Sequence, residues 1–284
     1  MPLELDARQR AMLQEMGVRV WLPGAAFEPP AAATTRPAAD TTVRAPTRSS
    51  LESPAPQAPP APMPGAAPVA QAALTAATEL DAMDGASLQQ AATLCKACGL
   101  CGGRRQAILC APGAGVQMDW MVVGDPPDEE EDRAGQVFVE QSGLLLDNML
   151  KAVGASRGGA GSQGAYLSAV VKCRPPHARL PVASELLQCS AYLRREIALV
   201  QPKAILAMGR FAVQTLLGDY PDQVALPLGK QRGAVYRFAG VPVVVTYHPK
   251  VLLRASADKA KAWADLCLAA QVIQGTEPSL QSAP

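Results

Sequence analysis

Short apolar segments alternate with helical patterns along most of this chain, and this alternation constrains the fold more than any other feature. Each predicted strand is short, rich in apolar residues and bounded by glycine or proline. The predicted strands are residues 120–123, 165–171, 204–208 and 241–246, and the predicted helices are residues 143–153, 184–200, 210–217 and 257–273. Strands separated by helices form a mostly parallel sheet that is covered on both faces. We therefore expect an α/β domain with three layers, α/β/α.

The ends of the predicted strands carry the chemically distinctive residues. Gly124 and Asp125 follow the first strand, Ala169 lies near the end of the second, Gly209 follows the third and His248 comes after the fourth. In open parallel sheets the ligand cleft lies outside the carboxyl ends of the strands. We therefore expect these residues to converge on one rim of the domain.

The N-terminal part of the chain has a different composition from the rest. A short helix is predicted near the start, with Asp6 as its N-cap and Gly17 at its end, followed by apolar residues that include Trp21. The Pro- and Ala-rich stretch that follows has almost nothing to bury and is predicted to be a disordered linker. The N-terminal helix either docks back on the domain or binds a partner. The expected segments are a helical peptide at 1–23, a linker at 24–79, the domain at 80–275 and a tail at 276–284.

Composition narrows the possible functions. The net charge is +1, so there is no overall basic signature for nucleic acid, although a local patch remains possible. No apolar run approaches the ~20 residues that span a bilayer, and no signal peptide opens the chain. We expect a cytoplasmic protein that makes no membrane contact and is a monomer apart from its partners. In that compartment the seven cysteines are metal ligands or reduced thiols.

Four cysteines are spaced like the ligands of a metal centre. Cys95 and Cys98 form a C-x2-C pair that supplies two thiolates, and Cys173 and Cys189 lie far downstream. Four thiolates hold either an iron–sulfur cluster or a structural zinc, and spacing alone does not separate the two. The remaining cysteines are predicted to be buried or free thiols: Cys101, Cys110 and Cys267.

A series of short motifs runs from about residue 94 to residue 269. In order they are residues 95–101, 121–127, 131–135, 137–139, 143–150, 170–176, 189, 206–210, 228–229, 232–233, 247–249, 252–254 and 263–266. Each motif alone is weak, but their order and spacing resemble the family 4 uracil-DNA glycosylases of bacteria and archaea. The resemblance implies the uracil-DNA glycosylase fold and a 4Fe-4S cluster. It also implies hydrolysis of the N-glycosidic bond of uracil, or of another damaged base, in DNA during base excision repair.

The resemblance assigns roles to individual residues. Gly124 allows close approach of a ligand, Asp125 places the attacking water, Phe138 stacks on a flipped base and His248 polarises the base. Each of these residues also has a structural interpretation, as part of a turn or of the core. The implied cluster ligands are Cys95, Cys98, Cys173 and Cys189. Basic residues near these motifs are candidate contacts to single- or double-stranded DNA: Lys172, Arg174, Arg232, Lys250 and Arg254.

The chain departs from the family pattern in the region of the site. Asp125 replaces Glu, and both Asp128 and Glu140 replace Gly. Ala169 stands where the family has Asn, whose amide both donates to and accepts from the edge of uracil, whereas alanine does neither. Ser168 is adjacent, but on a strand it points to the opposite face. The acidic run at 129–132 is interpreted as a solvated loop.

Two alternative functions from different classes are therefore considered. One is a DNA glycosylase, and the other is a weakly or non-catalytic DNA-associated adaptor for replication or repair. Residues 5–23 weakly resemble the N-terminal peptide of the psi subunit of the bacterial DNA polymerase III clamp loader. That peptide binds the chi subunit, which makes chi a candidate partner. A Trp residue and apolar helix residues are suitable anchors in a groove on a partner.

Overall fold

A computed structural model describes residues 79–109 and 117–275 of the 284-residue chain. The predicted N-terminal helix, the linker up to residue 78, Cys110 and the C-terminal tail lie outside these residues. None of the helices in the described ranges is long and apolar enough to cross a membrane.

A five-stranded sheet with strand order β2-β1-β3-β5-β4 forms the centre of the domain. The strands are β1 Met118–Gly124, β2 Gly161–Ala169, β3 Ala204–Met208, β4 Val235–Phe238 and β5 Val241–Thr246. The first three pairings from the β2 edge are parallel, and β4 pairs antiparallel with β5. The mostly parallel sheet is thus confirmed, whereas β4 was not predicted.

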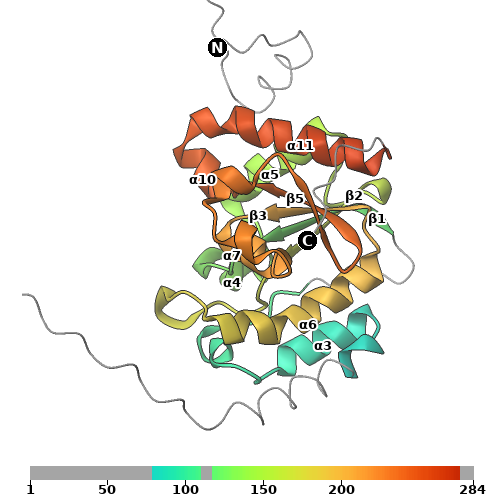
Figure 1. Cartoon of the computed structure of the whole chain (residues 1–284). Helices are drawn as coiled ribbons and strands as arrows, with labels where there is room; N and C mark the ends of the chain where they lie inside the picture. The colour runs from blue at the N-terminus through green and yellow to red at the C-terminus, as the bar shows by residue number, and fades with distance from the viewer. Residues whose placement is uncertain (1–78, 110–116, 276–284) are drawn as a thin grey trace, which may run out of the picture.

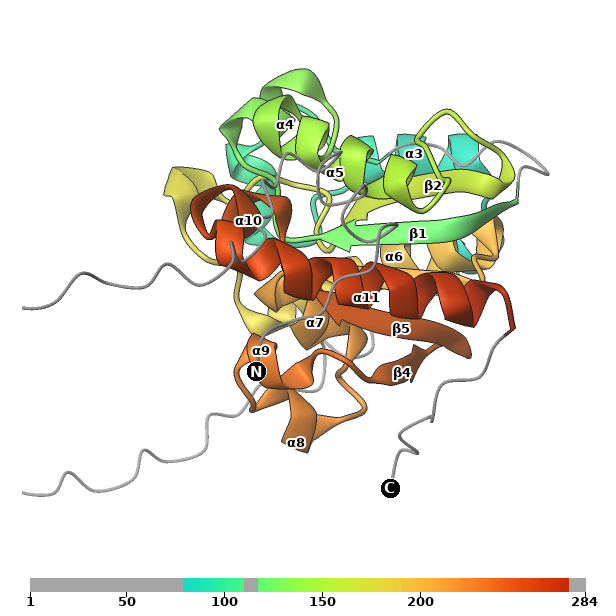
Figure 2. The same cartoon turned by 90° about the horizontal axis from the view of Figure 1, so that it is seen from above.

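Helices cover both faces of this sheet, as Figures 1 and 2 show. The longer helices are α3 Gly85–Leu94, α5 Glu140–Ala152, α6 Ala183–Val200 and α11 Lys259–Ile273. The shorter ones are α4 Glu129–Ala134, α7 Arg210–Leu216, α8 Pro221–Val224, α9 Leu228–Gln231 and α10 Pro249–Arg254. Short 3-10 segments lie at Gly99–Gly103, Pro176–Ala178 and Ser256–Asp258.

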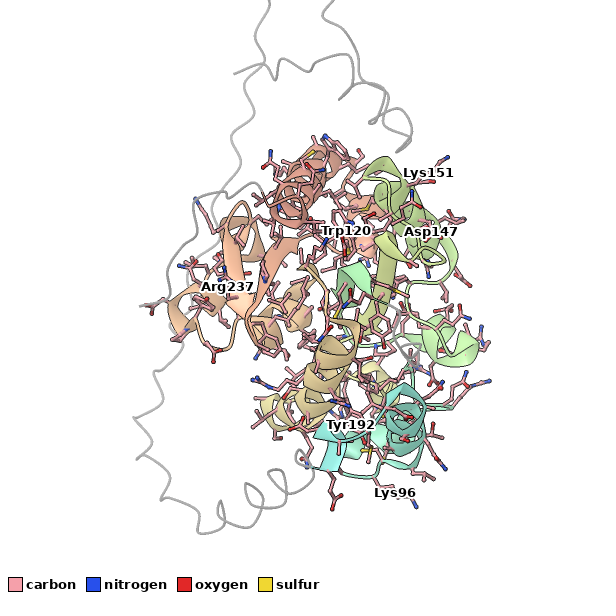
Figure 3. All side chains as sticks on the ribbon, turned by 90° about the vertical axis from the view of Figure 1, so that its right-hand side faces the viewer. Lys96, Trp120, Asp147, Lys151, Tyr192 and Arg237 are labelled. Atoms are coloured by element: carbon pink, nitrogen blue, oxygen red, sulfur yellow. The ribbon has the colours of Figure 1, made fainter. Side chains whose placement is uncertain are left out.

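The core divides into two clusters, one on each face of the sheet. Along β1, Met121 belongs to the cluster under α3, α6 and α7, whereas Trp120 and Val122 belong to the cluster under α5, α10 and α11. This division follows from the alternation of side chains along a strand. Figure 3 shows Trp120 inside the domain, while Lys151 lies at its surface. The three-layer α/β/α architecture is therefore confirmed.

The hairpin between β4 and β5 explains why β4 escaped prediction. Ala239 and Gly240 join the two strands, and both have positive φ, at 49° and 80°. Two central residues with positive φ form the tight turn that suits the twist of a hairpin. Alanine rarely adopts this conformation, so the local sequence does not indicate the turn.

The interpretation of residues 129–132 as a solvated loop is wrong. These residues begin α4, where Asp128 is the N-cap and forms a reciprocal capping box with Glu131. Asp132 is fully buried and its carboxylate accepts the backbone N–H of Arg105 at 2.9 Å. Four successive acidic residues at a helix N-terminus also suit the helix dipole.

Lys172 is buried, with 1% of its surface exposed, so its predicted contact with DNA phosphate is wrong. Its Nζ lies 2.5 Å from Oε2 of Glu196 and donates to Ser168 Oγ at 2.7 Å and to Ala169 O at 2.9 Å. The Tyr166 hydroxyl donates to Glu196 Oε1 at 2.8 Å. This network ties the end of β2 to α6.

Replacing Glu196 with Leu should lower the free energy of unfolding by about 3–5 kcal/mol, because it leaves the Lys172 ammonium buried without a counter-charge. The double variant Lys172→Met/Glu196→Leu should recover most of this loss. Arg133→Met, which breaks an exposed ion pair with Glu129, should cost less than about 1 kcal/mol. Urea unfolding of the four proteins measures these values. Equal losses in the single and double variants would contradict a pairwise role.

Candidate functional site

Gly124, Phe138, Ala169 and His248 come together at the carboxyl ends of β1, β2 and β5. Gly124 pairs with Ala169 across the two strands. A Cβ atom at Gly124 would lie 2.6 Å from Cζ of Phe138, so only glycine leaves room for this ring. The rings of Phe138 and His248 stack with their centroids 5.2 Å apart and 21° between their planes. The predicted convergence of the strand ends is therefore confirmed for Gly124, Ala169 and His248, and the structure adds Phe138 to them. We call these four residues the ring site.

The ring site is closed in this conformation. Phe138 is 2% exposed, Ala169 1% and His248 7%. Because the rings of Phe138 and His248 are already in stacking contact, a base cannot lie between them. Binding a flipped base there requires Phe138 to move.

His248 is held as a neutral hydrogen-bond donor. Its Nδ1 accepts the backbone N–H of Lys250 at 3.2 Å and thereby caps α10. Burial, with a smaller contribution from the nearby Lys250 ammonium, lowers the pKa of His248 to about 3. The imidazole is therefore uncharged at neutral pH, and Nε2 carries its single proton.

Asp125 anchors helix α7. Its Oδ1 accepts the backbone N–H of Phe211 at 2.8 Å and that of Ala212 at 3.2 Å. Burial raises the pKa of this carboxyl group. Gly209, with φ of 104°, packs so closely that a Cβ there would overlap the Asp125 carboxylate. Asp125 therefore has a structural role here, and its role in placing water stays a prediction.

The position of Ala169 leaves the ring site without an amide. Ala169 packs in the apolar cluster under α5, α10 and α11. Ser168 Oγ instead donates to Glu196 Oε2 on α6 at 2.9 Å, so it points to the opposite face of the sheet, as predicted. Neither side chain can therefore replace an Asn that reads a base edge.

The backbone around Phe138 is held in an unusual conformation. Phe138 and Glu140 both have φ of 53°, a region that favours glycine. Arg157 Nη2 donates to the carbonyl groups of Phe138 at 2.8 Å and Gly143 at 3.2 Å, which holds the segment against α5. Positive φ at Glu140 suits the glycine that the family resemblance implies at this position.

Most of the candidate DNA-binding cations have carboxylate partners. Arg174 pairs with Glu129 at 3.2 Å, and Lys250 pairs with Asp128 at 2.5 Å. Arg232 pairs with the buried Asp265 at 2.7 Å and lies over the ring of Tyr247, so its guanidinium group is committed to α11. Arg254, at the end of α10, is exposed.

One cavity is lined by the four predicted ligand cysteines together with Tyr192, and we call it the thiol cavity. The cysteines are Cys95, Cys98, Cys173 and Cys189. Burial raises the pKa of the Cys189 thiol to about 12, and burial also raises the pKa of Cys98 and Cys173. Lys172 donates its backbone N–H to Cys189 Sγ at 3.3 Å. In the described ranges, no three His, Cys, Asp or Glu side chains converge closely enough for a single metal ion.

Arg104 holds the thiol cavity together. Its guanidinium donates to Cys173 Sγ at 2.9 Å and to the carbonyl groups of Ala92 at 3.1 Å, Thr93 at 2.6 Å and Cys95 at 3.0 Å. These bonds join the end of α3 to the segment after β2. Figure 3 shows Tyr192 beside α3, where its hydroxyl donates to the Ala91 carbonyl at 3.3 Å.

Sequence reasoning missed Arg104, Glu131 and Glu196. Glu196 lies between Leu193 and Val200 on the buried face of α6, and a charged residue in an apolar stripe signals a buried partner. Glu131 lies in a capping-box pattern three residues after Asp128. For Arg104 the sequence carries no comparable signal, because its partners lie up to 69 residues away.

Comparison with known proteins agrees with this fold. The model of the uracil DNA glycosylase superfamily matches residues 112–267. A type-4 uracil-DNA glycosylase of Pyrobaculum aerophilum is 36% identical over 162 residues, which are 55% of this chain and 80% of that protein. One from Archaeoglobus fulgidus is 34% identical over 147 residues, covering 50% and 71%. One from Thermotoga maritima is 36% identical over 133 residues, covering 46% and 65%.

The pKa of His248 should make stability depend on pH. The pKa is about 3 in the folded chain against 6.5 for a free histidine, so the unfolded chain binds more protons between these values. Stability should therefore fall as the pH drops below 6.5, by about 2 kcal/mol at pH 5. His248→Asn should remove this dependence, because asparagine can still cap α10.

The matched control is His177→Asn, at the second histidine of the chain, which is exposed. Urea unfolding at pH 7 and pH 5 gives the comparison. A similar loss of stability at pH 5 in wild type and His248→Asn would contradict the burial of a neutral His248.

Proposed function

Because this chain belongs to the uracil DNA glycosylase superfamily, we propose that it hydrolyses the N-glycosidic bond of uracil, or of another damaged base, in DNA. This chemistry is the first step of base excision repair. The observation that carries the proposal is the ring site, where a neutral His248 lies beside Phe138 and Gly124 at the strand ends.

His248 is suited to stabilise the departing base. As the glycosidic bond breaks, negative charge develops on the base, and the Nε2–H group can donate to a carbonyl oxygen that carries part of it. A neutral donor in a buried site stabilises this charge strongly, because little water competes for the bond. Its position is held by the Nδ1 bond that caps α10.

Phe138 and Asp125 complete the proposed mechanism. A base stacks on the Phe138 ring once that ring moves away from His248, and stacking of this kind is worth roughly 1–3 kcal/mol for any base. The sugar gains positive character as the bond breaks, so the Asp125 carboxylate both stabilises it and orients the attacking water. In that state Asp125 gives up part of its contact with α7.

A 4Fe-4S cluster is part of the proposal, held by Cys95, Cys98, Cys173 and Cys189. Each iron atom of a cluster binds its own cysteine, so four thiols can lie spaced around one cavity. Zinc instead needs all four sulfur atoms within bonding distance of a single ion. The arrangement here therefore suits a cluster better than zinc. N–H donors to the sulfur atoms are already in place. When bound, the cluster would link three parts of the chain covalently: the segment after α3, the segment after β2, and α6.

The closed ring site favours a second candidate, a weakly or non-catalytic DNA-associated adaptor. Phe138 covers His248, and Ala169 offers no amide to a base. In this case residues 5–23, which lie outside the described residues, would dock the chi subunit of the clamp loader. Base release in the experiment below separates the two functions.

Base release from single- and double-stranded oligonucleotides that contain uracil, hypoxanthine or mismatched thymine tests the glycosylase. Ala169→Asn should raise the rate on uracil about ten- to a hundredfold, because one amide contact to the base is worth roughly 1–3 kcal/mol. Ala169→Leu has the same branched shape without the amide and should bring no gain. If neither wild type nor Ala169→Asn releases a base from any substrate while the fold is intact, the glycosylase function is contradicted and the adaptor function remains.

Anaerobic purification tests the cluster and the role of Arg104. Wild type should be brown, with broad absorbance near ~400 nm and iron and sulfide in equal amounts. Arg104→Gln should lose most of its iron, because it removes the bonds that hold Cys95 and Cys173 together. Arg105→Gln, at the exposed neighbour, should keep its iron. A colourless wild type that contains one zinc would contradict the cluster.

A further inference from the structure

Three charged side chains form a network beside the ring site. Lys250 Nζ on α10 lies 2.5 Å from Asp128 Oδ2 and 3.0 Å from Glu131 Oε2, both at the start of α4. Figure 2 shows α4 and α10 at the same end of the sheet. We call Asp128, Glu131 and Lys250 the latch.

The latch is connected directly to the ring that closes the site. Glu131 Oε1 accepts the backbone N–H of Phe138 at 2.7 Å, while its Oε2 contacts Lys250. Lys250 in turn donates its backbone N–H to His248. Glu131 therefore holds the backbone of Phe138, and Lys250 holds the ring of His248.

The latch also pairs a cation, Lys250, that is a candidate contact to DNA. The side chain of Lys250 is 31% exposed and that of Asp128 is 39% exposed, so both can be reached from the solvent. A DNA phosphate placed there would compete with the Asp128 carboxylate for the same ammonium group. Glu131 is 5% exposed and remains as a buried partner for Lys250.

We propose that Asp128 is a positioning residue that keeps Lys250 paired and thereby keeps its ammonium group from a DNA backbone phosphate. The inference rests on the proposed DNA substrate. It deepens that function by naming a competitor within the chain for one phosphate contact. Asp128 acts through Lys250 and Glu131 and does not itself touch the base.

Asp128→Asn is the decisive variant, because asparagine keeps the N-cap of α4 and removes only the charge. Because Lys250 then keeps only Glu131 as a charged partner, binding to a single-stranded uracil oligonucleotide should gain one phosphate contact. The plot of log affinity against log salt should then steepen by about 0.7. Fluorescence anisotropy between ~50 and 200 mM salt measures this slope, and affinity at low salt should rise severalfold.

A thymine oligonucleotide provides the second readout. The gain in affinity should be the same for a thymine oligonucleotide, since phosphate contacts carry no base information.

Glu130→Gln is the matched control, since it removes one negative charge two residues away in the same helix and outside the latch. It should leave the salt slope unchanged. In the Lys250→Met background, Asp128→Asn should bring no gain. Thermal unfolding of each variant checks that the fold is kept.

Identical slopes for wild type and Asp128→Asn would overturn the inference, as would an equal change with Glu130→Gln or a gain that persists in Lys250→Met. These outcomes are separable from the proposed function. If no protein releases a base but Asp128→Asn steepens the slope, the glycosylase fails and the latch stands. If wild type releases uracil and the slope does not change, only the latch fails.

Discussion

The buried ion pair between Lys172 and Glu196 is the contact on which both sites of this domain depend. The Lys172 ammonium donates to Ala169 O at the carboxyl end of β2, and the Lys172 backbone N–H donates to Cys189 Sγ in the thiol cavity. A buried ion pair is tolerated only when each charge has its partner and further hydrogen bonds, as it has here. The position of the strand end and the position of the thiol cavity are therefore set by the same residue.

The charge distribution of this nearly neutral chain bears on how it can act on DNA. The net charge is +1, and four of the five candidate DNA-binding cations in the described residues have carboxylate partners. Two of these pairs are largely buried and hold the fold, whereas those of Arg174 and Lys250 are partly exposed. In the proposed binding of DNA at this face, phosphates compete with these carboxylates, which weakens association and makes it depend on the acidic helix α4.

The fold was largely predictable, whereas the partners of the charged residues were not. Strand and helix periods indicated β1, β2, β3 and β5, because these elements bury regular apolar faces. The strand β4 was missed, since its turn uses an alanine with positive φ. The acidic run was misread as solvated, because burial of Glu131 and Asp132 depends on N–H groups from Phe138 and Arg105 that only the folded chain supplies.

The sequence by itself determined which residues reach the carboxyl ends of the strands, because connectivity and side-chain alternation are local properties of the chain. It therefore indicated Gly124, Ala169 and His248 as neighbours, and the absence of an amide at Ala169. Only the tertiary structure decided that Phe138 lies on His248 and that Lys250 is held by Asp128, 122 residues away. Such contacts depend on distances of a few ångströms between distant segments, which are set by the packing of the whole domain.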